Sequence, residues 1–389
     1  MKYYTEQENC RISGEPLNMA KTIASFDYLP IPGLFFNNPE TGIDKKVPFT
    51  VVQSPCGFIQ TKGNIQPDLY YYYKSRQADQ SHIQWNQLVA NQISSRFPLK
   101  ARILEVGGGE GLLLKDLHQK GFQNLNNVDP SHENENQDYF EPITGLFPEA
   151  LKSEKYSGTF DCIVGMHFLE HVADPVWVLQ EASRLLNDYG ECWIEVPDME
   201  SSALQSYFQI GIIYPLHINY FTRNTLQMAG RKAGMQLVSI EVVNHYGNSL
   251  WAKFTKNQIT DQTFKDSPEM VPTIERYFRE LGEFAGSLPK EILAWGAAER
   301  ALTTYAILSD YGIRLKGLFD SNPEIHGMYV SGVDLPISSP DEFPADSEHL
   351  LILSPPNHKS IINGIKQKLN PKIIIHVPFV GHLTLSDYV

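Results

Sequence analysis

The stretch ILEVGGGEG, residues 103–111, decides how the middle of this chain folds. Its first four residues indicate a buried strand, and apolar residues at helical spacing follow from Leu112. The glycines between them let the backbone turn tightly and approach a ligand closely. The helix N-terminus offers free N–H groups and a partial positive charge, which suit a carboxylate or a phosphate. Asp129 ends the next predicted strand, where an acid can accept both hydroxyls of a ribose.

Strands and helices alternate on both sides of this turn. Apolar runs predict the strands, and apolar residues at a spacing of three and four predict the helices. The expected strands are 125–128, 160–164, 192–196, 237–243 and 250–254, and the expected helices are 81–97, 175–186 and 225–233. This alternation predicts an α/β fold with a doubly wound, mostly parallel sheet, which is a Rossmann-like architecture.

The flanking regions differ from this central domain, which we place at residues 76–256. Residues 1–75 are rich in Pro, Gly, Asn and aromatic residues without a helical period, so we expect a small loop-rich module with short strands. Residues 257–290 are polar and helical and are interpreted as a connector. Residues 291–389 repeat the strand–turn–helix pattern, which predicts a second, smaller Rossmann-like domain.

Charge and composition exclude several classes of protein. The chain has 389 residues, with 32 Lys and Arg against 45 Asp and Glu, and a formal net charge of −13. No basic run supplies the face that nucleic-acid phosphates require, so DNA and RNA are poor candidates as partners. No apolar stretch approaches the ~20 residues that span a bilayer, and the N-terminus lacks an apolar signal segment. We therefore expect a cytoplasmic protein with no membrane partner, and its four cysteines make no disulfide framework.

Glycine turns occur in NAD, FAD and S-adenosylmethionine sites, so the turn alone does not choose among these ligands. Two details favour the methyl donor: Glu105 precedes the glycines, and their spacing is GGGEG rather than GxGxxG. Glu105 can contact the methionine end of the donor, and Asp129 its ribose. The candidate cofactor-binding residues here are Glu105, Gly107, Gly109, Gly111 and Asp129. A tight strand–helix turn without a ligand is the alternative.

The glycine turn, DPS at 129–131 and MHFLEHV at 166–172 together resemble the class I S-adenosylmethionine-dependent methyltransferases. The resemblance adds Met166 and His167 to the candidate cofactor-binding residues. Stretches along nearly the whole chain also resemble, in order, the three-part sugar C-methyltransferases, which make branched-chain deoxysugars. These stretches are CRISG at 10–14, SPCGFIQ at 54–60, YYYYKS at 70–75, YPLHINYF at 214–221, YGNSL at 246–250, WGAAERA at 295–301, DSNP at 320–323 and VDLPI at 333–337.

The chain departs from this family in its opening module, which usually holds zinc with four cysteines in two CxxC pairs. The matching positions here are Cys10, Ser13, Gln53 and Cys56. Structural zinc takes four nitrogen or sulfur ligands, so two thiolates do not make such a site. We expect no bound metal and a module held by packing; zinc completed by a distant histidine is the alternative.

The resemblance implies a small-molecule substrate, a keto-sugar carried on a nucleotide diphosphate, which is methylated on carbon through an enolate. Histidine suits the removal of a proton near neutral pH, and His217 is the candidate base. Tyr73, Tyr214 and His171 are candidates for positioning the substrate or stabilising the enolate. Arg300, near a predicted helix N-terminus, either meets the diphosphate or faces solvent.

A second departure lies beside His217. The family signature is YHEHxxYF, and this chain has YPLHINYF at 214–221, so Leu216 stands where the family has a glutamate. Either another acid orients His217, or the acceptor is an oxygen or nitrogen, whose lone pair makes one base sufficient. The rival functions are therefore O-methylation of a sugar or related small molecule, and non-catalytic binding of S-adenosylmethionine or a nucleotide sugar. The sequence does not predict an oligomeric state.

Overall fold

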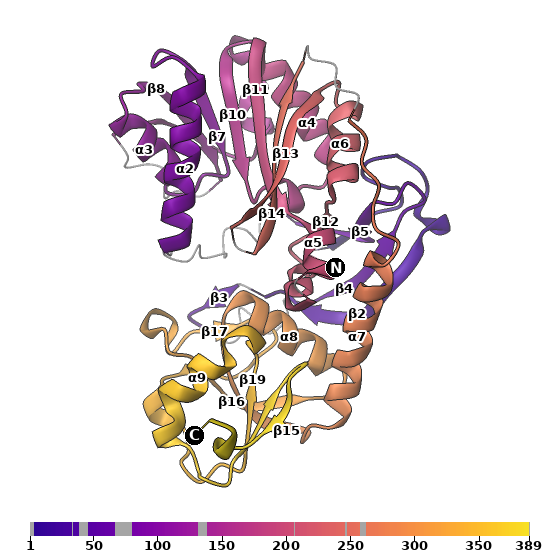
Figure 1. The fold of residues 1–389 in the computed structure, drawn as a ribbon, viewed down its shortest axis with the longest axis vertical. Helices are drawn as coiled ribbons and strands as arrows, with labels where there is room; N and C mark the ends of the chain where they lie inside the picture. Colours follow the sequence, from indigo (N-terminus) through magenta and orange to yellow (C-terminus); the bar gives the residue numbers. More distant parts are fainter. Residues whose placement is uncertain are drawn as a thin grey trace.

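The computed structural model shows three connected parts (Figure 1). The central domain and the C-terminal domain lie at opposite ends of the molecule, and the N-terminal strands run beside the junction between them. The structure describes residues 4–32, 34–38, 46–66, 80–130, 138–205, 207–245, 247–256 and 262–388. Among these residues, no helix combines the length and the apolar composition that crossing a bilayer requires.

The central domain is built on a seven-stranded sheet of order β13-β14-β11-β10-β7-β8-β9. Neighbouring strands pair in parallel except at β14, which runs antiparallel between β13 and β11. The strands are β7 (Arg102–Val106), β8 (Asn124–Asp129), β9 (Glu141–Thr144), β10 (Phe160–Met166), β11 (Leu186–Pro197), β13 (Gln236–Asn244) and β14 (Asn248–Thr255). The predicted doubly wound α/β sheet is thus confirmed.

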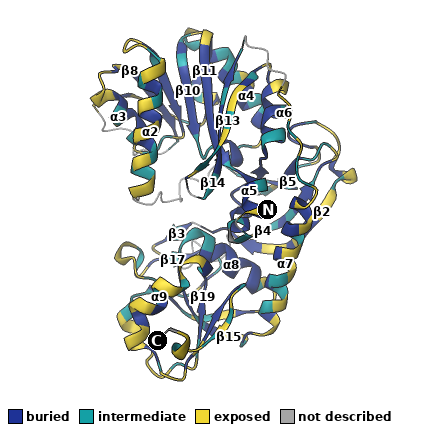
Figure 2. Cartoon of the chain, in the orientation of Figure 1, coloured by how far each residue is buried: buried dark blue, intermediate teal, exposed yellow. Residues whose placement is uncertain are grey.

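Helices cover both faces of this sheet, because each contributes an apolar stripe to the core. Helices α2 (Gln80–Arg96) and α3 (Leu112–Gln119) pack together on one face, and α4 (Pro175–Leu185) and α6 (Arg223–Lys232) pack on the other. Figure 2 shows that the strands between them are largely buried. Burial on both faces explains why these strands are continuous apolar runs instead of alternating ones.

Some elements of the central domain differ from the sequence pattern. The edge strand β9 carries Pro142 and no buried residue, so it gives no apolar signal. Helix α5 (Met199–Leu204) has only six residues and is capped by Asp198, whose side chain accepts a hydrogen bond from the Glu200 N–H over 3.2 Å. The strand expected at 192–196 begins six residues earlier, at Leu186, in β11.

The C-terminal domain contains a second, six-stranded sheet of order β18-β16-β15-β19-β20-β21, in which only β21 is antiparallel. Residues 270–286 of the connector form one long helix, which packs against the first helix of this domain. The elements are α7 (Met270–Gly286), β15 (Glu291–Trp295), α8 (Glu299–Asp310), β16 (Arg314–Phe319), β17 (Tyr329–Val330), β18 (Ile337–Ser338), β19 (His349–Ile352), α9 (His358–Ile365), β20 (Ile374–Val377) and β21 (Gly381–Leu383). This architecture confirms the second Rossmann-like unit.

The N-terminal module has more regular structure than its composition suggests. Its strands are β1 (Tyr4–Glu6), β2 (Lys21–Pro30), β3 (Phe35–Phe36), β4 (Lys46–Gln53), β5 (Ile59–Thr61) and β6 (Gly63–Ile65). Strand β12 (Asn219–Tyr220), which comes from the central part of the chain, pairs with β5, and β3 pairs with β17. The module therefore joins both larger domains, and it holds the chain directly after His217. The domain boundaries at 75, 256 and 290 stay predictions.

Candidate active site

The glycine turn lies at the point where the central sheet reverses its order. The chain leaves β7 for β8 on one side and later returns to β10 on the other. Open α/β sheets bind ligands in the crevice at such a switch point, beyond the carboxyl ends of the strands. Gly107, Gly109 and Gly111 have φ angles of 70°, 51° and 72°, a region that residues with a Cβ rarely adopt.

Two glycines of this turn show which of its sides is closed and which is open. A Cβ at Gly108 would lie 2.6 Å from the Glu105 carboxyl carbon, so the closed side has no room for a side chain. A Cβ at Gly109 would meet no atom within 4 Å. The Gly109 N–H donates a hydrogen bond to Asp129 Oδ2 over 3.0 Å. The turn therefore rests on Glu105 and leaves the side of Gly109 open to a ligand.

Glu105 fits the amino-acid end of S-adenosylmethionine. It is 3% exposed, and its Oε2 has no hydrogen-bond partner among the described residues. Burial, together with the Asp129 carboxylate, raises the pKa of Glu105 to about 8. An ammonium group brought to this oxygen would satisfy it and favour its ionised form. The donor set thus fits the methyl donor, with Glu105 toward the amino-acid end and Asp129 toward the ribose.

The end of β10 lies beside the glycine turn. A Cβ at Gly107 would lie 3.5 Å from the Phe168 ring, and the half-buried Met166 is the last residue of the strand. His167 lies between two carboxylates, with Nδ1 3.2 Å from Glu170 Oε1 and Nε2 3.3 Å from Glu195 Oε1. Burial alone would lower the pKa of His167, but the two carboxylates outweigh it and raise the pKa to about 10. His167 is therefore an imidazolium at neutral pH and unsuited to the role of base.

Glu195 connects His167 to His245, which follows β13, and to Trp85 on helix α2. Its Oε1 lies 2.7 Å from His245 Nδ1, and its Oε2 accepts a hydrogen bond from Trp85 Nε1 over 2.8 Å. Burial would raise the pKa of Glu195, but His167 and His245 outweigh it and lower the pKa to about 2. His167, Glu195 and His245 lie close enough to share a metal ion. Because these hydrogen bonds already use both carboxylate oxygens, we interpret the group as a structural network.

The loop that carries His217 is fastened to the short 3₁₀ turn η6 (Leu169–His171), which follows β10. Backbone and side-chain hydrogen bonds join the two segments at three residues of the loop. They link His171 Nδ1 to the Leu216 carbonyl (2.9 Å), the Ile218 N–H to the Glu170 carbonyl (2.9 Å), and Asn219 Nδ2 to the carbonyls of Leu169 (3.1 Å) and Val172 (2.8 Å). This attachment brings His171 and His217 together, with 4.8 Å between their ring centroids.

Arg11 fastens the same loop from the N-terminal module. The side chain is buried, and Nη1 donates to the carbonyls of Ile218 over 2.9 Å and Thr61 over 3.1 Å. Nη2 donates to the Gly63 carbonyl over 2.7 Å. Burial lowers the pKa of Arg11 to about 10, which leaves the guanidinium charged at neutral pH. Sequence reasoning missed this residue, although it lies inside the quoted CRISG stretch.

His217 itself is buried and uncharged. It is 8% exposed, and the Tyr214 ring lies over it with 4.2 Å between ring centroids. Burial, and then the electrostatic influence of His171, His167 and Arg300, hold the pKa of His217 well below its usual value. A base must be unprotonated before it acts, so the environment gives His217 the state that the predicted role needs.

Glu170 completes this group, and sequence reasoning did not select it. The side chain is 1% exposed, and its Oε1 lies 3.9 Å from His171 Nε2 and 4.0 Å from His217 Nε2. One carboxylate and two imidazoles are also a ligand set that divalent transition metals accept, and their ligand atoms lie within 4.8 Å of one another. The expectation of no metal stays a prediction. The signal for Glu170 was its place within MHFLEHV, directly before His171.

The structure therefore places His171, Tyr214 and His217 in one group, while Glu105, Gly107, Gly109, Gly111, Asp129, Met166 and His167 line the neighbouring switch point. The chemical role of each of these residues stays a prediction. Tyr73 lies outside the described residues.

The positions that match the zinc ligands of the family do not form a four-ligand site. Cys10 Sγ and Cys56 Sγ lie 3.6 Å apart, and the hydrogen bond between them lowers the pKa of Cys10 to about 4. The Ser13 N–H donates to Cys10 Sγ over 3.4 Å, and the Gln53 amide donates to a carbonyl of its own turn. In the described part of the chain, no group of three possible metal ligands includes either cysteine. These residues do not fit structural zinc, and its absence stays a prediction.

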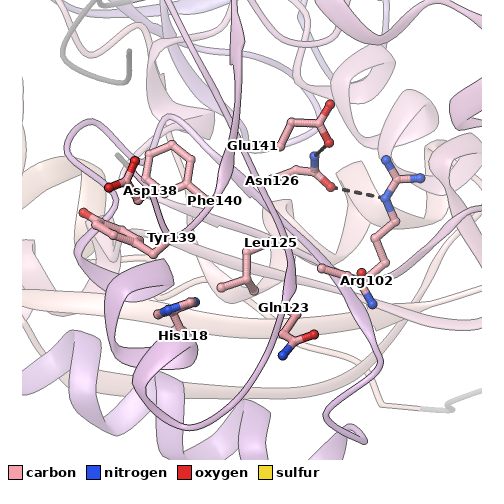
Figure 3. Close-up of a pocket in the computed structure, with 10 residues that line it drawn as sticks. Arg102, His118, Gln123, Leu125, Asn126, Asp138, Tyr139, Phe140 and Glu141 are labelled. Carbon is pink, nitrogen blue, oxygen red and sulfur yellow. Dashed lines mark hydrogen bonds between the residues drawn. The ribbon is translucent and has the colours of Figure 1, made fainter. Parts of the chain in front are cut away.

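A pocket of about 640 Å³ opens at the opposite edge of the central sheet (Figure 3). Its lining includes Arg102, Asn124 and Glu141, where strands β7, β8 and β9 begin. Asn126 accepts a hydrogen bond from Arg102 Nε over 3.2 Å and donates one to Glu141 over 2.9 Å. These polar groups satisfy one another at the ends where the strands begin, whereas the crevice of the switch point lies beyond the ends where they finish. We therefore place the active site at the switch point.

Family models of known proteins match the central domain and the C-terminal domain. Residues 80–240 match the family model of a methyltransferase domain, and residues 253–378 match that of a C-methyltransferase C-terminal domain. No curated protein matches the chain.

Similar solved structures include a chain from the Haloferax volcanii complex of the Trm112 methyltransferase activator with a methyltransferase. The match is 17% identical, covers 46% of this chain and 91% of that chain, and has a TM-score of 0.37. A SAM-dependent methyltransferase from Thermotoga maritima is 19% identical over 45% of this chain and 91% of that one, with a TM-score of 0.36. The magnesium protoporphyrin IX methyltransferase of Synechocystis with bound S-adenosylhomocysteine is 13% identical over 48% and 91%, with a TM-score of 0.37. These distant likenesses have no bearing on the substrate.

The two family models follow one another along the chain, over the glycine-turn domain and over the second Rossmann-like domain. The chain is an S-adenosylmethionine-dependent methyltransferase that carries the C-terminal domain of the C-methyltransferases.

Proposed function

We propose that this methyltransferase adds a methyl group to a carbon of a nucleotide-linked keto-deoxysugar, with His217 as the base. The observation that carries the proposal is the buried, neutral imidazole of His217 beneath the Tyr214 ring, on a loop fastened to the turn that follows β10. The match of residues 253–378 to the C-methyltransferases supports carbon over oxygen as the acceptor.

Carbon beside a ketone becomes a nucleophile only after it loses a proton. His217 takes this proton, and the electron pair of the C–H bond becomes the enolate. S-adenosylmethionine, when bound, would supply an electrophilic methyl group; the enolate carbon bonds to it as the sulfur–methyl bond breaks and S-adenosylhomocysteine leaves. The Tyr214 hydroxyl is the candidate donor to the enolate oxygen, where negative charge develops. Much of the acceleration comes from holding the acceptor carbon in line with the methyl group.

The nucleotide diphosphate has a candidate partner in the C-terminal domain. Arg300 lies in the first turn of α8, donates a hydrogen bond to Gln209, and is one of the positive charges that lower the pKa of His217. A guanidinium recognises phosphate oxygens in a planar, two-point geometry. A sugar diphosphate whose acceptor carbon lies at His217 would bring its negative charge toward Arg300. This arrangement gives the C-terminal domain a role in holding the nucleotide.

Proton exchange separates carbon methylation from its rivals. The enzyme is incubated in D₂O with nucleotide-linked keto-sugars, first without and then with the methyl donor. We expect deuterium at the carbon beside the ketone, followed by a product about 14 Da heavier with its methyl group on carbon. A methyl group found on oxygen would support O-methylation, and donor binding without turnover of any sugar would support a non-catalytic module.

His217→Ala tests the assigned base. We expect exchange and turnover to fall by about 10³-fold, because proton abstraction loses its acceptor, while calorimetry shows unchanged affinity for S-adenosylmethionine. His382→Ala is the control, since His382 is an exposed histidine in the C-terminal domain. Exchange that persists in His217→Ala would remove His217 from the mechanism.

A further inference from the structure

We propose that Glu170 is the acid that serves His217: its buried carboxylate holds the imidazolium that forms when His217 takes the substrate proton. This inference rests on the proposed function. It gives Glu170 a positioning role that neither the sequence pattern nor the family comparison assigns. It also identifies which acid replaces the glutamate that the family signature has at position 216.

The first support is a carboxylate oxygen without a donor. Glu170 is 1% exposed, and its Oε1 is used by His167 Nδ1 at 3.2 Å. Its Oε2 is buried and has no hydrogen-bond partner among the described residues. Burying a carboxylate oxygen without a donor costs free energy in the resting protein. The Glu170 carboxylate therefore has unused acceptor capacity for a donor that appears only during the reaction.

The second support is that the reaction creates this donor. Besides His167, the rings of His171 and His217 face Glu170, with their Nε2 atoms 3.9 and 4.0 Å from Oε1. We assign the Nδ1 proton of His171 to its bond with the Leu216 carbonyl, so His171 Nε2 carries a lone pair in the neutral ring. Whichever nitrogen of His217 accepts the proton, the imidazolium carries N–H groups on both nitrogens. The Nε2–H then needs to approach Oε1, now 4.0 Å away, by about 1 Å to make a hydrogen bond.

The third support is the charge around the base. Titratable groups from several elements surround His217 and its loop. They are His171 and Glu170 from η6, His167 from the end of β10, Arg300 from α8, Arg11 from the N-terminal module, and Tyr214 and Tyr220 from the same segment as His217. The cations among them oppose a further positive charge. Glu170 is the carboxylate of this group, and opposite charges attract strongly where water is excluded. Without it, an imidazolium at His217 would have no counter-ion in the group.

The position of Leu216 explains why the acid comes from another segment. Its side chain is fully buried in an apolar cluster with Ile31, Leu34 and Ile218. A carboxylate at that position would be buried among hydrocarbon, at a high cost in free energy. Glu170 instead reaches His217 from the opposite segment, and the backbone bond between the Ile218 N–H and the Glu170 carbonyl fixes the register of the two segments.

The test compares Glu170→Gln, which removes the charge at constant size, with Glu170→Asp, which keeps it. We expect Glu170→Gln to lower kcat by about 100-fold, with the affinity for S-adenosylmethionine changed less than about twofold and Glu170→Asp in between. Glu181→Gln is the control, because Glu181 pairs with Arg184 on helix α4. Retention of full kcat by Glu170→Gln would overturn the proposal.

A second measurement needs no substrate and therefore separates this proposal from the proposed function. NMR titration of labelled histidine reports the pKa of His217 in the wild type and in Glu170→Gln. We expect a lower pKa in the variant, because the imidazolium loses its counter-ion. An unchanged pKa would mean that Glu170 serves His167 alone. A wild type that methylates no keto-sugar but shows this shift would overturn the proposed function and leave the pairing intact.

Metal depletion tests whether this group binds a metal ion instead. The enzyme is dialysed against EDTA and assayed before and after addition of Mn²⁺ or Zn²⁺. We expect unchanged turnover. Loss on dialysis with recovery on metal addition would make Glu170, His171 and His217 metal ligands, and the proposal would fail.

Discussion

The donor side of the crevice comes from one run of chain, whereas the acceptor side is collected from distant segments. Glu105, the glycine turn and Asp129 lie within a single strand–helix–strand unit. The His217 loop instead is fastened to η6 and to Arg11 from the N-terminal module, and Arg300 from the C-terminal domain lowers the pKa of His217. One side is therefore fixed by local backbone geometry, and the other by tertiary contacts.

This difference predicts how each side responds to change. A local turn keeps its shape when distant residues are altered, because its hydrogen bonds close within the same unit. A loop held by separate segments loses its position when any one of them is disturbed, and reaction rates are sensitive to displacements of about 1 Å. Distant substitutions should therefore lower kcat without weakening the binding of S-adenosylmethionine.

Arg11→Ala gives the largest expected effect on this comparison. Removing the guanidinium frees the Ile218 carbonyl, so the His217 loop loses its attachment to the N-terminal module. We expect kcat to fall by about 100-fold while donor affinity, measured by calorimetry, is kept. Arg184→Ala is the control, because Arg184 also donates to a carbonyl, that of Leu151, over 2.8 Å, but away from the site. Equal losses of kcat in both variants would mean that Arg11 acts only through general stability.

Gly109→Ala is expected to do the opposite and weaken the donor side alone. Gly109 has a φ of 51° and open space at its Cβ position, so the added methyl would enter the region where the donor binds. We expect about a tenfold loss of donor affinity, with proton exchange at the acceptor retained. Gly158→Ala is a matched control, since Gly158 has a φ of 65° and equally open space. A similar loss of affinity in both variants would assign the effect to backbone strain.

The same contrast explains what the sequence could and could not predict. The glycine turn, Asp129 and the alternating strands follow from apolar periodicity and turn chemistry, both of which are local. His217, Tyr214 and His171 were selected from motifs, but Arg11 and Glu170 were not. Arg11 and Ile218 are 207 positions apart in the chain and meet only through the pairing of β5 with β12.

Glu170 and β9 show two further limits of sequence reasoning. Glu170 lies in a quoted motif, but a carboxylate in a sequence does not reveal which histidine it faces. The edge strand β9 is exposed and polar, so its pairing with β8 is decided by backbone hydrogen bonds that composition does not report. The connector was expected to be helical, and α7 is so, but its packing against the N-terminal strands requires the assembled core.

The smallest expected effect concerns the network that joins the two sides, and it depends on pH. The folded-state pKa of His167, about 10, lies above the ordinary value of 6.5, so its ion pairs with Glu170 and Glu195 contribute full stability below pH 6.5. This contribution falls as the pH rises from 6.5 through 10. We expect His167→Asn, chosen because asparagine tolerates the positive φ of 50°, to lower Tm more at pH 6.5 than at pH 9.5, by on the order of 2 °C.

The exposed His118→Asn should show no such pH-dependent difference. A constant difference in Tm across this range would mean that His167 is neutral in the folded protein and that its charge does not contribute to the low pKa of His217.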